Sequence, residues 1–302
     1  MTEDGNAFRA GLIYSLLSAI CFGFLAILFK LGYRENLSTG TMLTFRFIIA
    51  FIFLSPYIYF TKRKKILLHP KAIMMAAICG IFFYGIQSYC FAASIRYISA
   101  ATSGLILYLY PLVVMLLAAI LFKNRITREK VLSIVLILAG CLLVFYDAFS
   151  RRMDPTGLLL AVAAMLAFSA YFLFLQKSLI NVDSTVFSYY VIGFTALQCS
   201  FVYRPFCEMI LSPQQILICL LLALIPTVFA IILLYKAIER IGSSYAAIFS
   251  SVEPAVTILA AALLLQEHIE PLQIGGMLCI ICGIIVPNLK RLLKKNYPAA
   301  IA

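Results

Sequence analysis

The feature that most constrains this chain is a succession of apolar runs, each about 20 residues long, separated by short polar loops. About 20 apolar residues are what an α-helix needs to cross the hydrocarbon core of a bilayer. A hydrophobic content of 64% and a mean hydropathy of +1.04 exceed what one water-soluble core would bury. The sequence therefore predicts an all-α, polytopic integral membrane protein.

Windows of this length predict ten transmembrane helices, joined by loops too short to hold an extramembrane domain. The expected ranges are 10–31, 39–60, 72–93, 100–122, 130–148, 156–176, 185–204, 214–235, 244–265 and 271–289. Lys and Arg are concentrated in alternate loops, and seventeen of the 24 fall on one side if the N-terminus is inside. We therefore expect both termini to be cytoplasmic, in a cell (inner or plasma) membrane. This bias also explains the net charge of +12 without a nucleic-acid partner.

The two halves of the chain resemble each other when one is shifted by 143 residues. The strongest aligned pairs are Pro111 with Pro254 and Gly140 with Gly283. Since each half holds five predicted helices, an odd number, the halves must have opposite orientations in the membrane. The sequence predicts two inverted five-helix repeats, residues 1–150 and 151–302, an architecture typical of secondary transporters that work by alternating access.

Paired motifs in the two halves are similar to those of a known family. They read Leu109-Tyr110-Pro111-Leu112-Val113 in the first half, and Ser251-Val252-Glu253-Pro254-Ala255-Val256 with Gln266-Glu267-His268-Ile269 in the second. In these motifs the chain resembles the EamA-type transporters of the drug/metabolite transporter superfamily. It differs where Phe22 and Phe168 replace tryptophans common in that family, and where Asn124 replaces an acidic residue. The resemblance implies export or exchange of small organic solutes across a bacterial inner membrane.

Glu253 is the acidic residue that we expect in the middle of a span. A charge at the bilayer centre costs about 2.5–3.5 kcal/mol on insertion scales, so such residues usually face a partner or a water-filled cavity. Pro254 removes a backbone donor beside it, as Pro111 does in the other half, and both prolines predict a break in their helix. Because a proton and a cationic solute would compete for one carboxylate, we expect Glu253 to bind substrate and to couple transport to protons.

Arg46 is the second charged residue that we expect within a span. Neither Arg46 nor Glu253 has a charged counterpart at the matching position of the other half. Tyr110 stands in the place of Glu253 at the shift of 143 residues. Helix rise places Arg46 and Glu253 at depths that differ by roughly 5 Å, within reach of an arginine side chain. A structural ion pair between them is one interpretation, and a substrate site that includes Arg46, Glu253 and Tyr110 is the other.

Tyr84 and Gln87 lie one turn apart on one face of the third predicted helix, where lipid cannot satisfy their polar groups. Further tyrosines in the spans are Tyr14, Tyr108, Tyr110, Tyr171, Tyr235 and Tyr245. We expect about half of these eight residues to line a cavity suited to ring-bearing or cationic solutes. Tyr84 and Gln87 are therefore candidate substrate-binding residues.

The sequence offers little for other functions. His69 and His268 lie far apart in loops, Cys279 and Cys282 read as small apolar residues, and no phosphate-binding glycine motif occurs, so we expect no metal and no cofactor. An integral-membrane enzyme acting on lipids is the alternative from another class. The aspartates are dispersed rather than clustered, however, so we predict that the protein is not an enzyme.

We therefore predict a secondary active transporter of small organic metabolites, such as amino acids or other amphipathic or cationic solutes, that exports them. Uptake of a cationic or quaternary nutrient is the alternative direction. The expected partners are the small-molecule substrate, membrane lipids and protons. Gly275, Gly276 and Gly283 predict a packing seam on the last helix, and a monomer or a weak homodimer formed through it.

Overall fold

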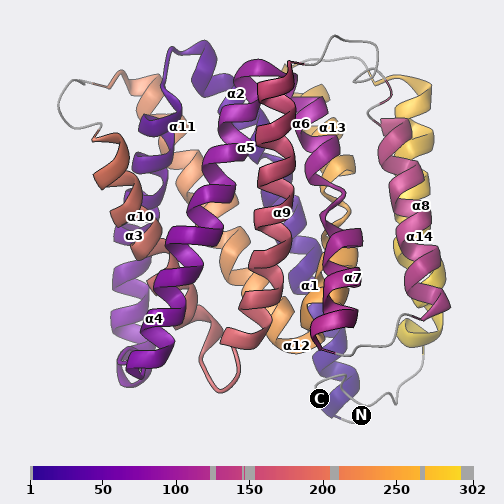
Figure 1. The fold of residues 1–302 in the computed structure, drawn as a ribbon, viewed down its shortest axis with the longest axis horizontal. Coiled ribbons are helices and arrows are strands. Elements are labelled where there is room, and N and C mark those ends of the chain that lie inside the picture. The colour runs from indigo at the N-terminus through magenta and orange to yellow at the C-terminus, as the bar shows by residue number, and fades with distance from the viewer. Residues whose placement is uncertain are drawn as a thin grey trace.

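The computed structural model describes residues 3–122, 127–144, 146, 154–204, 211–265 and 269–293 as a bundle of helices, without a strand in these ranges (Figure 1). Within these ranges, seven helical stretches are long and apolar enough to cross a membrane, and together they make this a multi-pass membrane protein. They are Ala7–Arg34, Thr39–Lys65, Pro70–Tyr97, Thr102–Leu121, Pro155–Ser178, Ser184–Tyr203 and Pro213–Ser250. Two shorter apolar helices, Glu253–Leu264 and Pro271–Ile285, complete the set.

The first half of the chain comprises α1 (Glu3–Gly23), α2 (Leu25–Arg34), α3 (Thr39–Lys62), η1 (Arg63–Lys65), α4 (Pro70–Ile78), η2 (Cys79–Gly85), α5 (Ile86–Tyr97), α6 (Ala100–Leu107), α7 (Tyr110–Leu121) and α8 (Arg128–Val144). The second half comprises α9 (Pro155–Ser178), α10 (Ser184–Tyr203), α11 (Pro213–Ala223), η5 (Leu224–Phe229), α12 (Ala230–Ser250), α13 (Glu253–Leu265) and α14 (Pro271–Leu293). Both η2 and η5 are π-helical turns inside longer helices. Asn124, Gln266, Glu267 and His268 of the sequence motifs lie outside the described residues.

Two helices are interrupted immediately before a proline. The chain leaves the helix at Tyr108 and Leu109 before α7, and at Ser251 and Val252 before α13. Pro111 and Pro254 are each the second residue of the new helix, where the missing backbone N–H costs no intrahelical hydrogen bond.

A third interruption, at Phe24 between α1 and α2, has no proline and differs from the continuous helix expected over residues 10–31. Tertiary contacts are made at this point. The Thr257 hydroxyl of α13 donates a hydrogen bond to the Gly23 carbonyl oxygen (3.0 Å), and the Val256 side chain packs against Gly23. A side chain from another helix thus interacts with a backbone group at the point where α1 ends.

The predicted boundary between helices 214–235 and 244–265 falls where the structure breaks the helix, because α12 consists of two helical segments joined across the non-helical residue Gly242. The helix is kinked at Gly242, whose φ of 74° and ψ of 165° are accessible to glycine and strained for other residues. Oε1 of Gln176 in α9 accepts hydrogen bonds from the Ser243 backbone N–H (2.8 Å) and hydroxyl (2.5 Å). A side chain from a neighbouring helix thereby pairs the backbone donor that the kink leaves free.

Helices α8 and α14 pair along one side of the bundle, at the right in Figure 1. Glycines bring the two backbones together: a β-carbon on Gly276 would lie 2.7 Å from the Gly140 carbonyl oxygen, and one on Gly283 would lie 2.9 Å from Leu136 Cβ. A β-carbon on Gly275 would meet nothing within 4 Å. The packing seam therefore involves Gly276 and Gly283, faces α8 of the same chain, and leaves Gly275 exposed.

An ion pair ties α3 to α10 at one end of the bundle. The Asp183 carboxylate accepts a hydrogen bond from Lys62 Nζ (2.9 Å), lies 3.6 Å from Lys65 Nζ, and caps the N-terminus of α10 through the backbone N–H groups of Thr185 and Val186. Burial of Asp183 raises its pKa, but the hydrogen bonds from Lys62 and the two backbone groups outweigh burial, so the net pKa is lowered. At this same end α1 begins and α14 ends (Figure 1).

Candidate functional site

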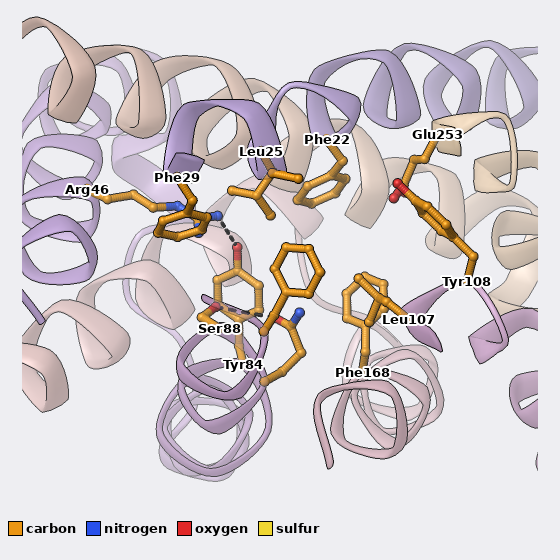
Figure 2. A pocket seen from close by; sticks show the side chains of 13 residues that line it. Phe22, Leu25, Phe29, Arg46, Tyr84, Ser88, Leu107, Tyr108, Phe168 and Glu253 are labelled. Atoms are coloured by element: carbon orange, nitrogen blue, oxygen red, sulfur yellow. Dashed lines mark hydrogen bonds between the residues drawn. The ribbon is translucent and has the colours of Figure 1, made fainter. Parts of the chain in front are cut away.

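A cavity lies where the interrupted helices and the π-helical turn η2 meet (Figure 2). The space free of protein atoms in and around it is about 500 Å³, a volume that includes space open to solvent. The lining residues are Phe22, Leu25, Ala26, Phe29, Arg46, Tyr84, Gln87, Ser88, Phe91, Leu107, Tyr108, Phe168 and Glu253. Of the thirteen, two are charged, four are uncharged and polar (Tyr84, Gln87, Ser88 and Tyr108), and the other seven are apolar.

Arg46 closes one end of this cavity and is 1% exposed. Its Nε donates to the Thr227 hydroxyl (2.5 Å), and its Nη2 donates to the Tyr84 hydroxyl (2.9 Å) and the Pro226 carbonyl (3.2 Å). The guanidinium carbon lies 4.9 Å from the ring centroid of Phe47, a favourable cation-π distance. Neutral oxygens and aromatic faces, rather than a carboxylate, therefore stabilise this buried cation.

The π-helical turn η5 prepares the oxygens that hold Arg46. Pro226 has no backbone N–H, so the carbonyl of Leu222 one turn earlier loses its usual donor. The Thr227 hydroxyl replaces that donor at 2.7 Å, which leaves its lone pairs for Arg46. Both Thr227 and the Pro226 carbonyl thus become acceptors within the bundle because a proline disturbs the helix.

Glu253 closes the other end of the cavity and is 5% exposed. It is the first residue of α13, where the helix dipole favours negative charge. Its side chain has neither an ion pair nor a hydrogen bond to any residue within the described ranges. The Tyr108 ring points toward the carboxylate (Figure 2), and its hydroxyl lies 3.3 Å from the Thr257 hydroxyl. A carboxylate buried in this way is stable as the neutral acid or with a cation beside it.

Arg46 and Glu253 do not form the ion pair that the sequence left open. Their side chains reach the cavity from opposite ends, with Phe22, Leu25 and Phe29 between them (Figure 2). The guanidinium contacts Phe29, at 5.9 Å from the ring centroid, whereas the backbone of Glu253 lies beside Gly23. The two charges therefore face one shared space without neutralising each other directly.

The candidate residues from the sequence divide into two groups. Tyr84, Gln87 and Tyr108 line the cavity with Arg46 and Glu253. Tyr110, Tyr171 and Tyr235 lie outside the lining: Tyr171 and Tyr235 join their hydroxyls at 2.7 Å, and the Tyr110 hydroxyl lies 3.5 Å from the Ala247 carbonyl.

The other two tyrosines contact cations away from the cavity. Tyr14 lies against Lys236 and Arg240, and Tyr245 lies against Lys130. Of the eight polar residues expected around an aromatic cavity, fewer than half line it.

Sequence reasoning missed several lining residues, and a signal existed for two of them. Tyr84, Gln87, Ser88 and Phe91 occupy positions i, i+3, i+4 and i+7 of one helix face, a helical stripe that extends the pair identified from the sequence. Leu25 and Leu107 lie in uniformly apolar stretches, where composition does not separate a cavity face from a lipid face. Within the described ranges no group of three or more His, Cys, Asp or Glu residues is placed to hold a metal ion.

Comparison with known proteins connects this geometry with transport. The family model described as the EamA-like transporter family matches residues 9–146 and again residues 155–289. The uncharacterized transporter YetK of Bacillus subtilis is 23% identical over 84% of this chain and 80% of its own length. An uncharacterized transporter of Haemophilus influenzae is 22% identical over 95% of this chain and 98% of its own.

Other similarities agree with these. The uncharacterized inner membrane transporter YhbE of Escherichia coli is 25% identical over 53% of this chain and 52% of its own length. A crystal structure titled only as that of a protein superposes with a TM-score of 0.79, covering 95% of this chain and 99% of its own at 18% identity. At that identity the superposition supports the fold alone.

Proposed function

We propose, from the premise that this chain belongs to the EamA-like transporter family, that it is a secondary active transporter for a small organic solute that binds between Arg46 and Glu253. The observation that carries the proposal is the buried cavity into which the two intramembrane charges point from opposite ends. Its lining is typical of small-molecule sites, which are mostly apolar with a few placed polar groups. Amino acids and other amphipathic or cationic solutes match such a site.

The proposed mechanism is alternating access between two inverted five-helix repeats that together cross the membrane ten times. Paired features of the two halves support it. The breaks before Pro111 and Pro254 correspond, as do the π-helical turns η2 and η5, and the cavity lies where the interrupted helices meet. Discontinuous helices around a midplane site are typical of transporters whose repeats move against each other.

The charge distribution supports an orientation with both termini in the cytoplasm of the cell membrane. Lys62, Lys65 and Asp183 lie together at the end of the bundle where α1 begins and α14 ends, so the basic loop after α3 would face the cytoplasm. In this orientation we propose export of the solute. Uptake of a cationic nutrient would use the same site in the opposite direction, and a transport assay with defined sidedness separates the two.

Glu253 is the proposed coupling residue. With no cation beside it in the described structure, its ionised form is costly to enclose, so a proton or a cationic group of the solute must accompany closure of the cavity. If a bound proton and the bound solute exclude each other from Glu253, the inward gradient of protons drives the solute outward. The requirement that the carboxylate be neutralised in every closed state links the two movements.

The test uses purified protein in liposomes, with counterflow and pH-driven accumulation measured for amino acids, organic cations and nucleobases. We expect Glu253→Gln to insert normally but to lose the dependence of transport on a pH gradient, because the amide neither binds nor releases a proton. Tyr110→Phe, at the matched position of the other half and outside the cavity lining, should retain the pH dependence and change affinity at most. Full pH-driven accumulation by Glu253→Gln would refute the coupling role, and turnover of a lipid without transport of any solute would refute the transporter.

A further inference from the structure

The guanidinium of Arg46 is positioned to bind an anionic group. Nε and Nη2 are occupied by Thr227, Tyr84 and the Pro226 carbonyl, which fix the plane of the guanidinium. Nη1 carries two further N–H groups, and the described part of the chain offers them no acceptor. Because its partners are neutral, they do not compensate the positive charge of this arginine. Its two remaining N–H donors can therefore bind a carboxylate.

The carboxylate of Glu253 has the complementary property at the opposite end. Within the described ranges it lacks an ionic or hydrogen-bonded partner, and its neighbours Tyr108 and Thr257 are already 3.3 Å from each other. A primary or substituted ammonium group placed in the cavity would neutralise it. Arg46 and Glu253 together therefore match one positive and one negative group of a bound solute, with no net charge left over.

The segment formed by the end of α1 and the start of α2 lies between them and sets how far apart those two groups must be. Phe29 contacts Arg46, and Phe22 lies toward Glu253, seven residues earlier on the same side of the cavity (Figure 2). Phe24, at the break between α1 and α2, keeps helical backbone angles (φ −78°, ψ −13°), so these seven residues still rise by roughly 10 Å. Subtracting a charge-assisted hydrogen bond of about 2.8 Å at each end leaves roughly 5 Å between the solute's own charged atoms. Two or more carbon atoms must therefore separate the ammonium group from the carboxylate group. An α-amino acid carries both groups on one carbon, which holds them too close together.

The wall between the two ends matches a hydrocarbon spacer. Phe22, Leu25, Phe29, Phe91 and Leu107 offer only carbon atoms there, with Gln87 and Ser88 as the polar exceptions. We propose that the solute is a zwitterion of the ω-amino acid class, with its carboxylate on Arg46, its ammonium on Glu253 and its carbon chain along this apolar wall. This rests on the proposed function and narrows its substrate.

The first test measures binding to the unaltered protein in detergent by calorimetry, with probes that differ by one group. Affinity should rise from glycine to 3-aminopropanoate and 4-aminobutanoate. Affinity for 4-aminobutanoate should exceed that for butylamine and for butanoate by about ten-fold or more, because each analogue lacks one charge-assisted contact. Tightest binding of glycine, or binding of butylamine equal to that of 4-aminobutanoate, would overturn the proposal. Failure of every probe to bind while another solute is transported would also overturn it but leave the proposed function intact.

The second test assigns each end of the solute to its residue. Glu253→Gln should remove the advantage of 4-aminobutanoate over butanoate and keep its advantage over butylamine. Arg46→Gln should show the converse. If Arg46→Gln does not fold, Arg46→Lys should reduce the advantage over butylamine without abolishing it, because lysine keeps the charge but not the fixed planar donors. Thr44→Val is the matched control on α3, because the buried Thr44 hydroxyl has no hydrogen-bond partner within the described residues and does not line the cavity. If the Glu253 and Arg46 variants lose both advantages equally, the two residues maintain the cavity rather than select the solute.

Discussion

The contact between α8 and α14 allows a prediction in which one substitution is made at two adjacent positions. A β-carbon on Gly276 would lie 2.7 Å from the Gly140 carbonyl oxygen and 2.7 Å from the Val144 backbone nitrogen, whereas one on Gly275 would meet nothing within 4 Å. Atoms of a neighbouring backbone cannot rotate away as a side chain can. Gly276→Ala must therefore push the two helices apart, and Gly275→Ala need not.

The magnitude follows because the two variants share every effect except the clash. Replacing glycine by alanine within a helix stabilises it by roughly 0.5–1 kcal/mol through backbone entropy, and this gain applies at both positions. Adding a methyl group to a closely packed contact costs roughly 1–3 kcal/mol. The difference between the two variants is the packing cost alone, and rigid backbone partners place it in the upper part of that range.

Thermal unfolding of the purified protein in one detergent measures this difference, since both variants have the same composition. We expect Gly275→Ala to melt at or slightly above the temperature of the unaltered protein and Gly276→Ala to melt several degrees below it. Equal melting temperatures would show that α8 and α14 do not approach as closely as their glycines indicate. A loss of stability at Gly275 instead would place another surface, such as a second copy of the chain, against that face.

Two further predictions concern the ends of helices. Gly242→Ala should destabilise the protein by roughly 1–3 kcal/mol, because alanine is strained at the φ and ψ angles of Gly242. A clash does not contribute, since the atom nearest to the new β-carbon, Gln176 Oε1, is 3.7 Å away. A melting temperature equal to that of Gly275→Ala would refute the strain. The lowered pKa of Asp183 means that its stabilising contribution is fully present above the unfolded value of about 3.9 and is lost as pH falls through the lower folded value. Asp183→Asn should remove that part of the acid dependence of the melting temperature, and an unchanged acid profile would show that Lys62 does not stabilise the ionised form.

The main outline of this protein follows from its sequence because lipid imposes one strict rule. Backbone polar groups in a bilayer must be paired within the segment, so an apolar run of sufficient length has to be a helix wherever the chain goes next. Local chemistry then fixes some details: Pro111 and Pro254 begin helices rather than continue them, and Glu253 carries a charge that must face something other than lipid. The similarity to EamA-type transporters, apparent in the paired motifs, agrees with the family match over both halves.

Only the tertiary structure decided which polar groups meet. Arg46 and Glu253 fall at similar depths in a linear reading, which allowed an ion pair, but the rotation of each helix about its axis directs them to opposite ends of one cavity. At the break before α2 the Gly23 carbonyl is contacted by Thr257, more than 200 residues later in the chain, and Arg46 is held by the Thr227 hydroxyl and the Pro226 carbonyl of a distant helix. In a chain this apolar, all faces of a transmembrane helix have a similar composition. The periodicity of the sequence therefore does not reveal how each helix is rotated about its axis. Contacts between distant segments determine the site.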